Sequence, residues 1–225
     1  MTMRHFTILG KSNFTLSIIC DILSEMFGRN YRLTIVSNIP DEENESLKFS
    51  FLTDDIDVEY LYHTEWKPSL SDQYILGVMG NSRKKVADFF LDKMSVDKSL
   101  FVNLIHPSSI IPKTTLSGTG ILIGPSVTLA PFVKVGDFVH INRCVSIGHH
   151  TVLSSVSRIN AGSTILGLCY IGEDVTVGPG CVILDKITIG DHSVIGAASM
   201  VNKNIPSSVM AYGSPAQIIR KIHAA

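Results

Sequence analysis

The sequence predicts a small parallel α/β domain followed by a parallel β-helix. The main observation is an aliphatic residue at every sixth position from Ile123 to Val201, without interruption. An α-helix, with about 3.6 residues per turn, cannot hold that phase. A second observation is the small or β-branched residue four positions after each aliphatic one. The third is the alternation of strand-like and helix-like segments before residue 105. A period of six residues indicates stacked β-helical coils that share one core.

Fourteen positions keep the aliphatic phase, and all of them are Ile, Leu or Val: Ile123, Leu129, Val135, Ile141, Ile147, Leu153, Ile159, Ile165, Ile171, Val177, Ile183, Ile189, Ile195 and Val201. Three hexapeptides complete one triangular coil, so residues separated by three hexapeptides should lie side by side, about 4.8 Å apart along the axis. Gly or Asn often follows the aliphatic residue, as Gly148 and Asn160 do. We expect these residues to form the corners, because Gly and Asn tolerate a positive φ.

Residues 1–104 are expected to form the α/β domain. Strands are predicted at 6–9, 33–36, 74–79 and 101–105, and helices at 15–27 and 81–94. The acidic segment 41–45 is predicted to be a solvated loop. Strands that alternate with helices in this way indicate a small parallel sheet.

Residues 105–225 are expected to form the β-helix domain. The hexapeptide phase is poor between Pro107 and Leu122, which predicts an irregular first coil that caps the helix. At the other end, Asn204-Ile205-Pro206 breaks the strand pattern. The segment 216–223 is predicted to form a short C-terminal helix that closes the core.

Composition excludes several classes of protein. The 225 residues are 45% hydrophobic and 17% charged, which is typical of a folded soluble protein. With a net charge of −1, the chain has no positive electrostatic field that would attract nucleic acid or an anionic membrane. No apolar run has the length of a membrane span. The N-terminus lacks the features of a signal peptide, so we expect a cytoplasmic protein. Cys169 and Cys181 fall at small interior positions and are predicted to be reduced packing residues.

Three motifs resemble one family of enzymes. They are Ser-Ile-Gly-His-His-Thr-Val at 146–152, Tyr-Gly-Ser-Pro-Ala at 212–216 and Ile-His-Pro-Ser at 105–108. They are similar to the sugar acyltransferase family that includes sialic acid O-acetyltransferases and UDP-4-amino-sugar N-acetyltransferases. The resemblance implies a left-handed β-helix, a Rossmann-like domain that holds the acceptor, and a homotrimer. It also implies that acetyl-CoA lies between neighbouring subunits and that no metal is required.

The same resemblance assigns roles to individual residues. His149 takes the place of the catalytic base, and Gly167 and Ala197 occupy positions where backbone amides meet the thioester arm of acetyl-CoA. His150 stands where the family usually has an acidic residue, and Arg158 stands where a second His is common. The loop Gly10-Lys11-Ser12-Asn13-Phe14 keeps only the first residue of the family's Gly-x-Gly-Gly-His. Four residues of this loop are candidates for binding the acceptor: Gly10, Ser12, Asn13 and Phe14.

The residue types suit acyl transfer from a thioester. The reaction needs a base for the proton of the attacking hydroxyl or amine, and donors for the oxyanion that forms. Histidine is largely neutral near pH 7, so His149 can be that base, and His150 can reach the same groove if both lie at a corner. Gly167 follows His149 by three hexapeptides and would leave room for a thioester one coil further on. Arg158 offers a planar fork for a pyrophosphate or a carboxylate, which makes it a candidate coenzyme ligand.

The predicted function is acetyl transfer from acetyl-CoA to a hydroxyl or amino group of a sugar or sugar nucleotide, for a surface glycan. Two alternatives stay open. One is a non-catalytic β-helix scaffold that has lost its acceptor site, which the altered loop suggests. The other is a zinc enzyme similar to the γ-carbonic anhydrases, which needs three convergent imidazoles. The histidines of the repeat are His140, His149, His150 and His192, and their spacing does not favour convergence.

Overall fold

The computed structural model describes residues 3–38, 56–80 and 82–222. The chain divides into two compact units, 1–107 and 108–225, three residues after the predicted boundary. The predicted loop at 41–45 lies outside the described residues. Within the described ranges, no helix has the length and apolar character needed to cross a membrane.

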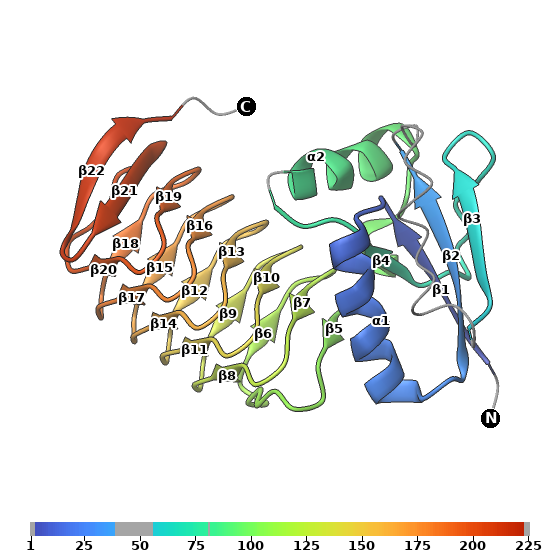
Figure 1. Cartoon of the computed structure of the whole chain (residues 1–225), viewed down its shortest axis with the longest axis horizontal. Coiled ribbons are helices and arrows are strands. Elements are labelled where there is room, and N and C mark those ends of the chain that lie inside the picture. Colours follow the sequence, from blue (N-terminus) through green and yellow to red (C-terminus); the bar gives the residue numbers. More distant parts are fainter. Residues whose placement is uncertain (1–2, 39–55, 81, 223–225) are drawn as a thin grey trace. The chain divides into compact units, whose positions relative to one another are not determined.

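The first unit contains a parallel sheet with the strand order β3-β2-β1-β4. Its strands are β1 (Arg4–Leu9), β2 (Tyr31–Ser37), β3 (Val58–Tyr62) and β4 (Tyr74–Leu76), and every pair of neighbours is parallel. This arrangement confirms the predicted Rossmann-like sheet (Figure 1). The edge strand β3 was not predicted, because Glu59 interrupts its short apolar pattern, Asp57 precedes it, and none of its residues is fully buried.

Helix α1 (Asn13–Phe27) follows β1 and buries Leu16, Ile19 and Leu23. It ends at Gly28, whose φ of 61° is unfavourable for other residues. The N–H of Gly28 donates to the Ser24 carbonyl at 2.8 Å. The second predicted helix, at 81–94, is α-helical only in its first half. It begins as α2 (Ser82–Asp88) and continues as a π-helical segment (Phe89–Lys93). A 3₁₀ turn (Lys98–Leu100) and β5 (Leu104–Ile105) complete the unit. Only the second half of the strand predicted at 101–105 is therefore a strand.

The second unit is a stack of two-residue parallel strands with three faces (Figure 1). The first face contains β7 (Leu122–Ile123), β10 (His140–Ile141), β13 (Arg158–Ile159), β16 (Thr176–Val177) and β19 (Val194–Ile195). The second face contains β8 (Thr128–Leu129), β11 (Ser146–Ile147), β14 (Thr164–Ile165), β17 (Val182–Ile183) and β20 (Met200–Val201). The third face contains β6 (Leu116–Ser117), β9 (Lys134–Val135), β12 (Val152–Leu153), β15 (Tyr170–Ile171) and β18 (Thr188–Ile189).

The register confirms a coil of three hexapeptides. His140 lies opposite Arg158, Ser146 opposite Thr164, and Val152 opposite Tyr170, and each pair is separated by three hexapeptides. The second residue of each strand points into the core, and none of the fourteen aliphatic positions is more than 4% exposed. The stack agrees with the left-handed class of parallel β-helix. The apolar column along the axis supplies the hydrophobic stabilisation, about 25 cal/mol for each Å² removed from water.

The reason given for the glycines after the aliphatic positions was wrong. Positive φ values occur three residues after each aliphatic position up to Ile195, for example at His150 (59°) and Leu168 (61°), and not at the following Gly or Asn. Gly148 is required for a different reason, because a β-carbon there would lie 2.4 Å from the backbone nitrogen of Gly167. These glycines let successive coils stack at strand spacing.

The predicted C-terminal helix at 216–223 was also wrong. Strands β21 (Val209–Gly213) and β22 (Ala216–Lys221) form an antiparallel hairpin, and β21 pairs in parallel with β19 on the first face. The hairpin continues the backbone ladder of that face, and its hydrogen bonds override the weak helical preference of the segment. Gly213, with a φ of 115°, supplies the turn.

Candidate active site

His149 and His150 occupy the turn between β11 and β12, where the second face meets the third. Both side chains are exposed, and their Nδ1 atoms lie 3.1 Å apart, within hydrogen-bonding distance. The two rings are nearly perpendicular, with an interplanar angle of 86°. Because the residues sit in a turn and not along a strand, both rings lie on the same side of the coil. The structure therefore brings the two candidate catalytic residues together.

Residues of the neighbouring coils that do not ionise flank this pair on both sides. On the following coil lies Gly167, where a β-carbon would be 2.8 Å from Nε2 of His149 and 3.0 Å from its Cε1. On the preceding coil lies Phe132, whose ring centroid is 4.9 Å from that of His150. The imidazole of His149 therefore occupies room that exists because residue 167 has no side chain.

Buried hydrogen bonds hold the turn in place. The N–H of His150 donates to the Pro131 carbonyl at 3.2 Å, and the His149 carbonyl accepts from the N–H of Leu168 at 2.8 Å. Thr151 is fully buried, donates from Oγ1 to the Leu166 carbonyl at 3.0 Å, and accepts from the N–H of Cys169 at 3.2 Å. Backbone and side-chain bonds thus join this turn to the coils on both sides.

The two candidate contacts for the thioester arm lie on opposite edges of the second face. Gly167 follows β14 at the edge that carries His149, whereas Ala197 precedes β20 at the other edge. Ala197 is exposed, and a β-carbon placed on Gly178 would lie 2.7 Å from its backbone nitrogen. An extended ligand that reached both Gly167 and Ala197 would have to cross the second face.

Arg158 does not join the histidine pair. It lies on β13 in the first face, which is opposite the corner that carries His149. Its side chain is buried, with 6% exposure, and donates a hydrogen bond to Oγ1 of Thr176. Burial lowers the pKa of Arg158, and the nearby Asp174 carboxylate opposes that shift. Within one chain, a role for Arg158 beside His149 has no geometric support.

The candidate acceptor residues lie in the first unit, at the carboxyl end of β1. Gly10 has a φ of 82°, and a β-carbon there would lie 2.7 Å from Cγ1 of Val86. Ser12 caps α1 only through its backbone, and its N–H donates to the Gly77 carbonyl at 3.1 Å. Asn13 begins α1, and the ring of Phe14 is 62% exposed. Ligands of open α/β sheets bind at the carboxyl ends of the strands, where this loop lies.

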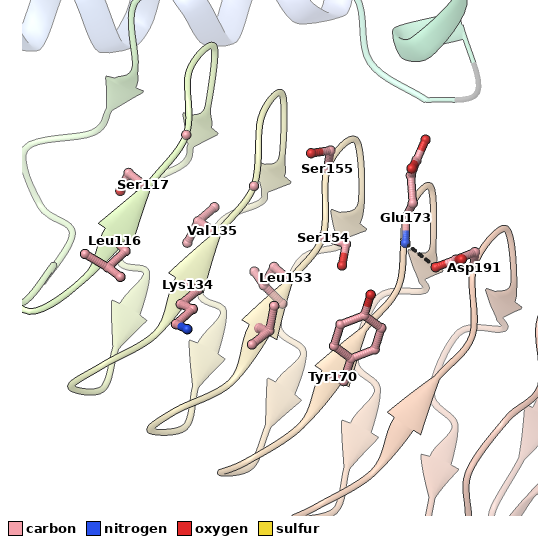
Figure 2. A pocket seen from close by; sticks show the side chains of 13 residues that line it. Leu116, Ser117, Lys134, Val135, Leu153, Ser154, Ser155, Tyr170, Glu173 and Asp191 are labelled. Carbon is pink, nitrogen blue, oxygen red and sulfur yellow. Dashed lines mark hydrogen bonds between the residues drawn. The ribbon is translucent and has the colours of Figure 1, made fainter.

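An open pocket of about 490 Å³ lies on the third face and includes residues of β12, the strand that follows His150 (Figure 2). Figure 2 shows the ring of Tyr170 and the side chain of Lys134 on the strands, with Ser155 and Glu173 along the adjoining turns. Hydroxyl, carboxylate and ammonium groups beside one aromatic ring suit a polar ligand such as a sugar.

Sequence reasoning missed Phe132, Thr151 and Tyr170. Phe132 lies one full coil before His150, and Tyr170 lies one full coil after Val152, so the coil spacing would have found both. Thr151 falls at a position assigned only to packing. Its double hydrogen bond depends on the stacking of coils, which the local sequence does not show.

The zinc alternative requires three histidines that point to one site. Among the residues that the structure describes, no group of three or more His, Cys, Asp or Glu side chains is placed to hold a metal ion. His140 is buried in β10, with 3% exposure. His192 faces Asp174, with Nδ1 at 3.6 Å from Oδ2, in a turn between the third and first faces.

Comparison with known proteins identifies a known repeat in part of the second unit. Residues 168–203 match the family model for the bacterial transferase hexapeptide (six repeats). These residues, within the β-helix of the second unit, thus carry the hexapeptide repeat of bacterial transferases.

Relatives in sequence are named as acetyltransferases. The chain is 37% identical to galactoside O-acetyltransferase of Lactococcus lactis over 110 residues, covering 47% of this chain and 52% of that protein. It is 36% identical to the putative colanic acid biosynthesis acetyltransferase WcaF of Escherichia coli over 92 residues, covering 34% and 47%. The chain thus spans about half the length of the relatives it matches.

Solved structures share the fold over almost the whole chain. The acetyltransferase domain of PglB from Neisseria gonorrhoeae, in complex with acetyl coenzyme A, has a TM-score of 0.75 with 14% identity, covering 97% of this chain and 100% of that chain. A variant of perosamine N-acetyltransferase from Caulobacter crescentus, in complex with CoA and GDP-perosamine, has a TM-score of 0.73 with 19% identity, covering 97% of both. At these identities the likeness concerns the fold.

Proposed function

We propose that this protein transfers an acetyl group from acetyl-CoA to a hydroxyl or amino group of a sugar or sugar nucleotide. The observation that carries the proposal is the position of His149. Its exposed ring lies over Gly167 of the next coil, in the same β-helix whose residues 168–203 match the hexapeptide repeat of bacterial transferases. The activities for which similar proteins are named, O-acetylation of galactosides and N-acetylation of perosamine, support the same class of reaction.

The reaction proceeds by direct attack within a ternary complex. Nε2 of His149 takes the proton of the acceptor O–H or N–H while the acceptor atom bonds to the thioester carbonyl carbon. The resulting oxyanion needs hydrogen-bond donors, and the backbone N–H of Gly167, beside His149, is the first candidate. The intermediate then breaks its C–S bond, and the CoA sulfur receives the proton from His149. The products are the acetylated sugar and free CoA thiol.

The residues present fit a thioester. The arm of acetyl-CoA would pass beside Gly167, whose backbone lies next to the His149 ring, and continue along the second face toward Ala197. The third-face pocket offers polar groups to a sugar, and its residues Ser154, Ser155, Glu173 and Asp191 lie in the turns between the third and first faces. We assign Gly10, Ser12, Asn13 and Phe14 to the acceptor, with the exposed ring of Phe14 as an apolar contact.

We further propose a cytoplasmic homotrimer. Large apolar side chains are exposed around the histidine turn: Phe132 (52%), Leu166 (38%), Leu168 (48%) and Tyr170 (43%). Such a group on a β-helix suits coverage by a second copy of the chain, and closed rotational symmetry then gives a ring.

The test is the release of CoA thiol from acetyl-CoA with two acceptors, GDP-perosamine for amino transfer and a simple galactoside for hydroxyl transfer. With an acceptor that the wild type acetylates, His149→Ala should lower kcat by about 10² to 10⁴, with acetyl-CoA binding largely retained in calorimetry. A variant that kept more than about half of the activity would remove His149 from the mechanism. A wild type that consumed no thioester across a panel of sugars and sugar nucleotides would favour the scaffold alternative.

A further inference from the structure

His150 is in direct contact with the candidate base, and that contact has only two possible proton arrangements. The two Nδ1 atoms are 3.1 Å apart, so one of them must carry the proton and the other must accept it. If His149 donates, its Nε2 carries a lone pair and can accept a proton. If His150 donates, Nε2 of His149 carries hydrogen and cannot act as a base. The direction of one hydrogen bond therefore decides whether His149 is chemically competent.

From this geometry we infer that His150 is the positioning residue of the site: its Nδ1 accepts the Nδ1 proton of His149 and thereby keeps Nε2 of His149 free. This inference rests on the proposed function of His149. A histidine performs here the orienting task for which a carboxylate is more usual, since the hydrogen bond at one ring nitrogen fixes the tautomer at the other. When His149 receives the acceptor proton, the same hydrogen bond stabilises the imidazolium that forms.

The position of the His150 ring is itself determined by contacts. The residue has a φ of 59°, so the backbone turns its side chain back toward the preceding residue, and its N–H is bonded to Pro131. The ring packs on Phe132 with centroids 4.9 Å apart and an interplanar angle of 36°. Phe132 thus supports one side of the His150 ring.

Few other charges reach the pair. In the same turn of the adjacent coils stand Pro131 and Phe132 on one side and Gly167 and Leu168 on the other, none of which titrates. The next charged residues of this column are Lys113, two coils before the pair, and Asp185 and Lys186, two coils after it. Nζ of Lys186 lies 4.0 Å from Oδ2 of Asp185. On the adjoining third face, Lys134 and Tyr170 precede and follow β12 in the stack. The side chain that faces His149 in this turn is thus the ring of His150.

Four variants of residue 150 separate the possible roles. His150→Asn keeps an acceptor oxygen at about the position of Nδ1 and tolerates a positive φ, so it should retain activity close to wild type. His150→Ala and His150→Gly lack the acceptor and should lose about 10- to 100-fold in kcat, with little change in KM for acetyl-CoA. Gly accepts the positive φ without strain, so a loss shared by Ala and Gly is not caused by instability. His150→Asp supplies a charged acceptor that favours the imidazolium form of His149. As the pH is lowered, the activity of this variant should therefore decline at a higher pH than that of the wild type.

NMR of the imidazole nitrogens provides a readout that needs no acceptor. His149 should carry its proton on Nδ1 in the wild type and in His150→Asn, and should shift toward the Nε2–H tautomer in His150→Ala. Cys144→Ala is the matched control, because Cys144 is exposed and has a φ of 58° at a different corner of the coil. That control should change neither the tautomer nor the activity.

The outcomes distinguish this inference from the proposed function. An unchanged tautomer in His150→Ala, an Nε2–H tautomer in the wild type, or full activity of His150→Gly would each overturn the role of His150. A wild type with the expected tautomer that never consumes acetyl-CoA would leave the hydrogen bond in place and remove the acyltransferase assignment instead.

Discussion

Replacing Gly167 with Ala tests the site with the smallest possible change. The new β-carbon would lie 2.8 Å from Nε2, 3.0 Å from Cε1 and 3.1 Å from Cδ2 of His149. Non-bonded carbon and nitrogen atoms favour separations of at least about 3.5 Å, so the ring must move by about 0.7 Å or more. The φ of Gly167 is not positive, so the backbone accepts Ala without strain. Only the exposed imidazole has to give way.

A displacement of that size at the proposed general base is expected to be costly for catalysis and nearly neutral for folding. A misplacement of about 1 Å can lower a rate by about 10²-fold, and we expect that loss in kcat/KM. The unfolding free energy should change by less than about 1 kcal/mol, because an exposed ring can move into solvent. The assay is thiol release from acetyl-CoA with an acceptor that the wild type uses, together with thermal unfolding.

Two other glycines serve as matched controls. A β-carbon at Gly148 would lie 2.4 Å from the backbone nitrogen of Gly167, so Gly148→Ala should destabilise the coil itself. A β-carbon at Gly162 has no atom within 4 Å, and the φ there is 70°, so Gly162→Ala should cost about 1 kcal/mol in stability and leave kcat unchanged. If Gly167→Ala folded normally and kept full activity, His149 would not be a base that acts beside Gly167.

Three further predictions concern assembly, pH and the acceptor. Light scattering should give three times the mass of the chain at working concentrations, and a fully active monomer would contradict the proposed trimer. Burial raises the pKa of the Cys20 thiol from 9.0 to about 11. Between pH 9 and 11 the thiol therefore ionises more readily in the unfolded chain than in the folded one, so the unfolding free energy is unaffected below pH 9 and falls across this window. Compared with Cys20→Ala, the wild type should lose about 2 to 3 kcal/mol more unfolding free energy across that window, and parallel curves from denaturant titrations would show that the thiol is not buried. Because Phe14 and the side chains of Ser12 and Asn13 alter the acceptor loop, calorimetry with common UDP-4-amino sugars should show Kd values weaker than about 1 mM. Tight binding would contradict this prediction, and tight binding that Phe14→Ala leaves unchanged would also exclude the apolar contact proposed for Phe14.

The sequence alone determined the architecture of the second unit, whereas the choice of His149 as candidate base rests on the resemblance of its motif and stays a prediction. An uninterrupted period of six residues admits few folds, because each aliphatic side chain must point into one core at every coil. The same spacing predicted that Gly167 lies beside His149, and the two residues are adjacent in the structure. The alternation of strands and helices was enough to predict the parallel sheet of the first unit, apart from β3, whose acidic neighbours hide its pattern.

Only the tertiary structure decided how residues meet across coils and corners. The positive φ at His150 turns its ring onto Nδ1 of His149 and onto Phe132, whereas a strand would have sent neighbouring side chains to opposite faces. Arg158 is close to His149 in sequence, yet half a coil of separation puts it on the opposite face. The segment 216–221 has the local spacing of a helix but forms β22, because the backbone groups of β21 provide hydrogen-bond partners that local sequence does not reveal. Periodicity therefore fixes which residues share a core, while corner geometry and strand pairing fix which side chains share a site.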